Sequence, residues 1–391
     1  MANKIPSLLT MTRELIAIPS VSCVNPAQDQ SNQTIIECLA NWCRDLGFDC
    51  KILPVPQHKG KFNLIATLGS GEGGLVLAGH TDTVPYNAER WQTEPFCLTE
   101  IDNRLYGLGT ADMKTFFALV LTAIAQLSPP LSLRQPLIIL ATADEESTMS
   151  GARALATAKQ FQARYAVIGE PTGLRPVRMH KGIFMEAIHL WGQSGHSSDP
   201  TLGNSALEGM YSVIGELLKW RNELQANHIN NLFKVPVPTM NLGHIHGGDN
   251  PNRICADCEL RLDLRPLPTM DLAQLRATLH HRVQRVLEGS GLEIEFVPLF
   301  EGIPAYETPA KTDIVKIVEH LTKQTAGAVA FGTEAPYLQE LGMETIILGP
   351  GDIEQAHQPN EFIALERLQP MINILTPLIK YFCFHPSSEN Q

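Results

Sequence analysis

Four short apolar runs of the sequence each end in histidine, aspartate or glutamate, the residue types that bind transition metals. The runs cover residues 74–82, 136–146, 165–172 and 344–352. The candidate ligands at their carboxyl ends are His80 and Asp82, then Asp144, Glu145 and Glu146, then Glu170, and finally Asp352 with His357 just beyond. In open α/β sheets, sites form beyond the carboxyl ends of the strands, so these groups can converge. Several facing carboxylates are costly unless a cation neutralises them, and mixed imidazole and carboxylate ligands favour zinc or a similar ion over calcium or magnesium.

Two spacings within these runs carry more information than the single residues. His80 and Asp82 lie on the same face of a strand, where the carboxylate can orient the imidazole. A histidine at a strand end is by itself more often an ordinary surface residue. Glu145 and Glu146 could belong to a solvated helix start. Because they directly follow a buried strand, they can instead divide two tasks, one binding metal and the other accepting a proton from water.

The elements that must position these residues form an alternating pattern. Runs that are apolar on both faces are typical of parallel strands covered by helices. Helical patterns lie between them at 32–47, 112–127 and 151–159. The sequence therefore predicts an α/β layered domain. The glycine-rich stretch at 69–74 precedes a strand instead of opening a helix, so it indicates a hairpin turn and not a nucleotide-binding loop.

The pattern changes between about residues 181 and 303. The order becomes strand, helix, two strands, helix and strand, which predicts a ferredoxin-like βαββαβ domain. We expect it to be inserted into the first domain, which would contain residues 1–180 and 304–391. Cys255 and Cys258 form a C-x-x-C pair within this region. Residues three apart on a strand point to opposite faces, so a zinc or redox role for the pair is the less favoured interpretation.

Length and charge exclude several classes of protein. The 391 residues suggest two or three folding units. The net charge of -11 gives no basic surface for nucleic acid or anionic lipid and indicates a small-molecule ligand. The N-terminus shows an amphipathic pattern and no export signal, and the longest apolar stretch, 116–127, is too short to cross a bilayer. Eight scattered cysteines are typical of reduced thiols, so we expect a soluble, cytoplasmic protein.

Five motifs in this order resemble those of the dinuclear zinc aminoacylase and carboxypeptidase family called M20. They are GHTDTVP at 79–85, GLGTADMK at 107–114, ADEES at 143–147, IGEPT at 168–172 and AHQPNEF at 356–362. The resemblance implies a zinc-peptidase-like catalytic domain with a mostly parallel central sheet, and an inserted domain that acts as lid and dimerisation domain. It also implies two divalent ions, zinc or cobalt, and a homodimer.

The same resemblance implies a role for individual residues. One metal would be bound by His80 and Glu170, the second by Glu146 and His357, and Asp112 would bridge both. Asp82 would support His80, and Glu145 would be the general base. His196 would reach the partner's active site across the dimer, while Asn252 and Arg265 would bind the substrate carboxylate. The peptide bond between Asp112 and Met113 would be cis.

Several stretches favour one substrate within the family. Residues 143–147, 258–268, 331–339 and 348–362 resemble members that hydrolyse N2-acetyl-L-ornithine to acetate and L-ornithine in arginine biosynthesis. Desuccinylases acting on succinyl-diaminopimelate have a Ser-Asp-Gly core where this chain has Thr333, Glu334 and Ala335. A desuccinylase, an acetylcitrulline deacetylase and a dipeptidase remain alternatives. A catalytically inactive protein that binds acylated amino acids is a further alternative, which the complete motif set, including Glu145, disfavours.

Overall fold

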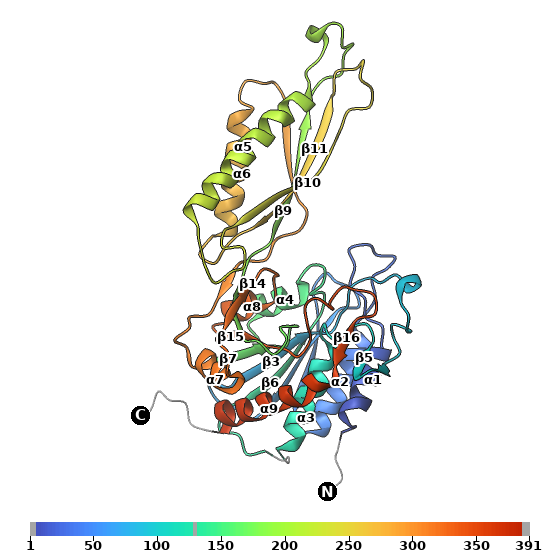
Figure 1. Cartoon of the computed structure of the whole chain (residues 1–391), viewed down its shortest axis with the longest axis vertical. Coiled ribbons are helices and arrows are strands. Elements are labelled where there is room, and N and C mark those ends of the chain that lie inside the picture. The colour runs from blue at the N-terminus through green and yellow to red at the C-terminus, as the bar shows by residue number, and fades with distance from the viewer. Residues whose placement is uncertain (1–4, 128–130, 385–391) are drawn as a thin grey trace. The chain divides into compact units, whose positions relative to one another are not determined.

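The computed structural model describes residues 5–127 and 131–384, and the chain forms two compact units (Figure 1). The first unit contains the chain up to residue 178, residues 308–327 and the chain from residue 333. The second unit contains residues 179–307 and 328–332. Within the described residues, no helix is long and apolar enough to cross a membrane.

The main sheet has the strand order β1-β2-β6-β3-β7-β15-β8-β13, and β14 also pairs with β8. The bounds are β1 Asp49–Pro54, β2 Phe62–Leu68, β3 Leu75–His80, β6 Leu137–Thr142, β7 Tyr165–Ile168, β8 Val177–His180, β13 Tyr306–Glu307, β14 Gly327–Val329 and β15 Glu344–Ile347. The four runs predicted to be strands are β6, β3, β7 and β15, and they are parallel neighbours. The pairs β1 with β2, β2 with β6 and β15 with β8 are antiparallel. The predicted α/β class is confirmed, but the sheet is mixed, because antiparallel pairs flank the four parallel central strands.

Helices cover both faces of this sheet. They are α1 Leu8–Ala17, α2 Gln33–Asp45, α3 Lys114–Gln126, α4 Ser150–Ala158, α7 Asp313–Thr322, α8 Ala335–Glu340 and α9 Leu368–Ile379. Alternate residues of β3, β6 and β7 join one large core with α1, α2, α3 and α9. The intervening residues of these strands are buried as well, on the side where α4 and α8 lie (Figure 1). Burial on both faces explains why these strands are continuous apolar runs.

A small antiparallel sheet joins two segments that are distant in sequence. Its order is β16-β5-β4, with β4 Thr99–Ile101, β5 Arg104–Tyr106 and β16 Phe362–Ala364. β5 leads into the turn that carries Asp112, and β16 follows the segment that carries His357. The pairing of β5 with β16 therefore fixes these two segments side by side.

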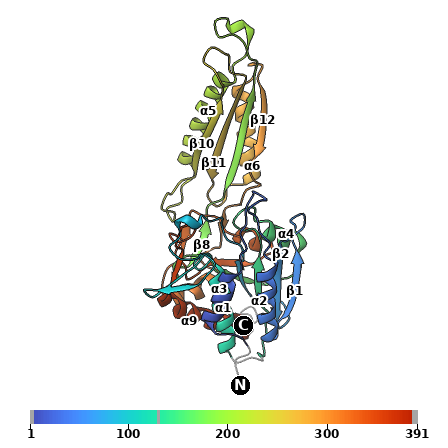
Figure 2. The ribbon, with the colours of Figure 1, turned by 90° about the vertical axis from the view of Figure 1, so that its right-hand side faces the viewer.

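The second unit has the element order βαββαβ. The elements are β9 Phe184–Trp191, α5 Ala206–Asn227, β10 Thr239–Gly247, β11 Asp257–Arg265, α6 Leu272–Val286 and β12 Glu293–Pro298. The sheet is antiparallel in the order β10-β11-β9-β12, and α5 and α6 pack on one face (Figure 2). Ser205 and Asp271 cap these helices, since their side chains accept hydrogen bonds from the backbone N–H groups of Glu208 and Gln274.

Candidate active site

Three segments bring acidic groups to the His80 imidazole at the carboxyl end of β3. His80 Nε2 lies 3.0 Å from Asp112 Oδ1 and 3.9 Å from Glu170 Oε1. Asp112 is in the turn before α3, and Glu170 follows β7. One ligand atom from each of His80, Glu145 and Glu170 lies within 4.8 Å of the others, and the same holds for His80, Asp112 and Glu146. The predicted convergence of the strand ends is present.

The second oxygen of Asp112 faces a different histidine. His357 Nε2 is 3.5 Å from Asp112 Oδ2 and 2.9 Å from Glu146 Oε2. Asp112 thus presents one oxygen to His80 and the other to His357. A carboxylate that presents its two oxygens to two different imidazoles is suited to bridging two cations.

The buried carboxylates of the cluster are unfavourable as anions unless cations neutralise them. Burial raises the pKa of Glu145 and of Glu170 well above the ordinary carboxyl value, and neighbouring carboxylates add to this. Burial opposes ionisation of Asp112, but hydrogen bonds with His357 and His80 lower its pKa. Within the described residues, Glu170 Oε1 is buried and has no hydrogen-bond partner. The cluster contains four carboxylates and two imidazoles, and the Glu170 carboxylate has a buried oxygen without a hydrogen-bond partner in the part of the chain that the structure describes. This combination of ligands is suited to divalent cations.

Asp82 supports the cluster through its backbone as well as its side chain. Its carbonyl oxygen lies 3.0 Å from His80 Nδ1, whereas its carboxylate Oδ1 is 3.7 Å from the same atom. The carboxylate Oδ2 instead accepts a hydrogen bond of 3.0 Å from the backbone N–H of Glu146. Asp82 therefore orients His80 and also holds the turn that carries the two glutamates.

Two of the candidate ligands, Asp144 and Asp352, lie outside the cluster. Asp144 forms an ion pair with Lys61, with Oδ1 and Nζ 2.7 Å apart. Asp352 Oδ2 is 3.0 Å from Arg367 Nη2. Neither carboxylate belongs to the two groups of possible ligands, so the runs contain more acid than the site uses.

The turn before α3 depends on a glutamate that sequence reasoning did not single out. Glu361 is buried, and its carboxylate accepts hydrogen bonds from the backbone N–H groups of Gly109, Ala111 and Asp112. Burial raises the pKa of Glu361 to about 8, although these hydrogen bonds oppose the shift. Its position in the AHQPNEF motif, four residues after His357, was the available signal. The predicted cis peptide bond between Asp112 and Met113 is present.

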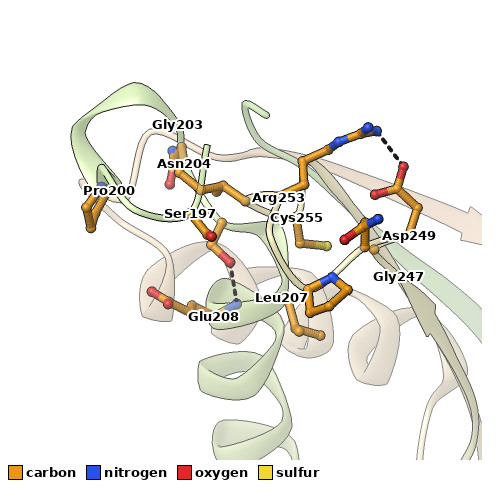
Figure 3. Close-up of a pocket in the computed structure, with 15 residues that line it drawn as sticks. Ser197, Pro200, Gly203, Asn204, Leu207, Glu208, Gly247, Asp249, Arg253 and Cys255 are labelled. Carbon is orange, nitrogen blue, oxygen red and sulfur yellow. Dashed lines mark hydrogen bonds and ion pairs between the residues drawn. The ribbon is translucent and has the colours of Figure 1, made fainter. Parts of the chain in front are cut away.

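The remaining predicted residues belong to the second unit. His196 and Asn252 are exposed on adjacent segments, since the Ser197 N–H donates to the Asn252 carbonyl. These segments border a cavity of about 710 Å³ whose wall includes Ser197 and Arg253 (Figure 3). Arg265 lies at the other end of β11, and its Nε donates to Asp263. The structure brings His196 and Asn252 together, but not Arg265 with them.

A clustered His, Asp and Glu set at the carboxyl ends of parallel strands defines a candidate metallohydrolase site. The model of peptidase family M20/M25/M40 matches residues 76–381. The chain belongs to this family and is a hydrolase that acts on an amide bond. An acetylornithine deacetylase from Edwardsiella ictaluri is 49% identical over 98% of this chain and 100% of the relative.

Solved structures share the fold over almost the whole chain. A tripeptidase from Staphylococcus aureus has a TM-score of 0.74 at 20% identity, covering 96% of this chain and 97% of that one. A dinuclear metal-binding peptidase of family M20 from Bacillus subtilis has a TM-score of 0.64 at 17% identity, covering 95% and 98%. The family model and the relative from Edwardsiella ictaluri confirm the predicted family, and these solved structures confirm the fold.

Proposed function

We propose that this chain hydrolyses N2-acetyl-L-ornithine to acetate and L-ornithine in arginine biosynthesis, with two divalent ions, zinc or cobalt, per subunit. The observation that carries the hydrolase part is the meeting of His80, Asp112, Glu146, Glu170 and His357 around one cluster. The relative from Edwardsiella ictaluri, named acetylornithine deacetylase, supports the substrate. Eight free cysteines, all within the described residues, support a cytoplasmic location.

In this proposal each oxygen of the Asp112 carboxylate would face one of two metal positions. His80 and Glu170 would hold one ion, Glu146 and His357 would hold the other, and Asp112 would contribute to both positions. When bound, the ions supply Lewis-acid chemistry that lowers the pKa of water and polarises the scissile carbonyl.

The side chains of the chain supply the proton transfers and the substrate contacts. Glu145 accepts the proton of the attacking water and returns it to the leaving amine. His196 of a partner subunit donates a hydrogen bond to the developing oxyanion. Asn252 and Arg265 bind the substrate carboxylate, for which the planar guanidinium is suited.

A substrate panel tests the assignment. We expect acetate release from acetylornithine to exceed, by at least about tenfold in kcat/KM, the hydrolysis of succinyl-diaminopimelate and acetylcitrulline. A tenfold ratio corresponds to about 1.4 kcal/mol of differential transition-state binding, within reach of one polar contact. A tenfold preference for either competitor would replace the substrate assignment and leave the hydrolase assignment intact.

We propose that the chain forms a homodimer through the β10 edge of the second unit. β10 and β12 are the edge strands of the sheet. β12 exposes Glu293, Glu295 and Pro298, which protect an edge from further pairing. β10 exposes Ile245, which is 51% exposed, compared with 38% for Val297 of β12. The helix α5 next to β10 also exposes Leu207 and Tyr211, which are 48% and 80% exposed and one helical turn apart.

Replacing Ile245 tests this surface. We expect Ile245→Lys to shift the protein from dimer to monomer in light scattering after size-exclusion chromatography, because the charge would be buried in the interface. Val297→Lys on β12 is the matched control, since Val297 is also partly exposed on an edge strand. It should leave the dimer intact. Dissociation by the control alone would place the interface at β12.

A further inference from the structure

A buried ion pair lies directly behind the turn that carries the two glutamates. Lys61, immediately before β2, and Asp144, just after β6, have side chains that are only 3% and 4% exposed. Their charged atoms are 2.7 Å apart. Lys61 Nζ is also 2.7 Å from Asp29 Oδ1, and that carboxylate is 29% exposed. Lys61 therefore contacts two carboxylates, the buried Asp144 and the partly exposed Asp29.

Three further side chains contact the Asp144 carboxylate. The Ser22 hydroxyl donates to its Oδ1 and the Ser150 hydroxyl to its Oδ2. His58 Nδ1, on a half-exposed ring, lies 3.5 Å from Oδ2. Burial opposes the charge on Lys61, yet hydrogen bonds to Asp144 and Asp29 raise its pKa above the ordinary lysine value. Lys61 therefore stays a cation against the carboxylate.

The backbone at Asp144 turns sharply. Its φ of 58° is in the left-handed region, which aspartate enters more often than most residues that have a side chain. The Asp144 carbonyl accepts hydrogen bonds from the N–H groups of Thr148 and Met149, which closes the turn. The Asp144 side chain then points to Lys61, while Glu145 reaches His80 and Glu170. Asp144 and Glu145 are consecutive residues, so the side chain of one is directed to Lys61 and the side chain of the next is directed to the cluster.

Buried ion pairs contribute little net stability, because desolvation offsets their attraction, but they can fix one geometry among several. We propose that the Lys61–Asp144 ion pair is a positioning device that holds Glu145 in the orientation needed to accept a proton. This inference rests on the proposed function, in which Glu145 is the base. Lys61 is a positioning residue, since it acts through Asp144.

The test removes the charge of Lys61 and keeps most of its volume. We expect Lys61→Met to lower kcat by about 10- to 100-fold with KM changed less than about threefold, because misplacing a catalytic group by about an ångström has that effect. Metal content should stay at the parent value. Asp29→Asn is the matched control, because it removes the other partner of Lys61 and leaves the Lys61–Asp144 pair. It should keep kcat within about threefold of the parent.

A second measurement separates positioning from general loss of structure. In a Glu145→Asp background the base is already displaced, so adding Lys61→Met should lower kcat far less than it does in the parent. Lys61→Arg, which keeps the charge, should recover part of the lost kcat. Equal fractional losses in both backgrounds, or equal kcat for Lys61→Met and Asp29→Asn, would overturn the inference alone. A parent protein that hydrolyses none of the amides would overturn the proposed function as well.

Discussion

Replacing Glu145 by glutamine is expected to lower kcat by about 10³-fold while metal content and thermal stability remain those of the parent. Loss of a general base commonly costs between about 10²- and 10⁴-fold. The amide has nearly the same shape but cannot accept the proton from water. Because Glu146, not Glu145, contacts His357, the proposed second metal position keeps its ligands in this variant. Steady-state kinetics with metal analysis by mass spectrometry measures both quantities.

The matched control for this variant is Glu94→Gln, since Glu94 is exposed. It should leave kcat unchanged. Turnover in Glu145→Gln equal to that of the parent would show that another group accepts the proton. A parallel loss of metal would indicate that Glu145 is a ligand, which its place within 4.8 Å of His80 and Glu170 makes the main competing role.

Replacing Asp112 by asparagine is expected to lower kcat by an equal or larger factor, because it alters both of the proposed metal positions. Asp112 presents separate oxygens to His80 and His357, and the neutral amide has only one oxygen for the two ions. We expect bound metal to fall from about two ions per chain towards zero. Metal ions stabilise the transition state by several kcal/mol, so we expect their loss to lower kcat by roughly 10³-fold or more. Chelation of the parent protein should abolish activity in the same way, and adding zinc or cobalt should restore it.

Asp352→Asn is the matched control. It removes a carboxylate that is close to a proposed ligand in the sequence but lies outside the cluster. Asp352 is five residues before His357, but its carboxylate pairs with Arg367. We expect this variant to retain two ions and most of its activity. Two bound ions in Asp112→Asn would contradict the bridging role.

The sequence predicts the site as a set of residue types at strand ends, and it does so because strand alternation and helix spacing repeat regularly. His80, Glu170 and Glu146 each lie within a motif whose position relative to a buried strand can be read directly. The α/β class is confirmed for the same reason, because strands buried on both faces leave an unmistakable apolar pattern. The antiparallel pairs at the flanks of the sheet were not predicted, since edge strands such as β1 are only partly buried and their pattern is weak.

Beyond a strand end no such repeat exists, and individual torsions decide which side chain enters the site. Asp144, Glu145 and Glu146 are chemically similar neighbours, yet the left-handed backbone at Asp144 sends its carboxylate to Lys61. Glu361 is in a recognised motif, but its effect on the Asp112 turn depends on hydrogen bonds to distant backbone N–H groups. Those of Ala111 and Asp112 are 250 and 249 residues away in the chain. The amino-acid sequence by itself determined the family, the layered fold and the pool of candidate ligands, because these follow from local periodicity and motif order. Only the tertiary structure decided which acids share the cluster, because that depends on long-range hydrogen bonds and buried ion pairs that no local pattern encodes.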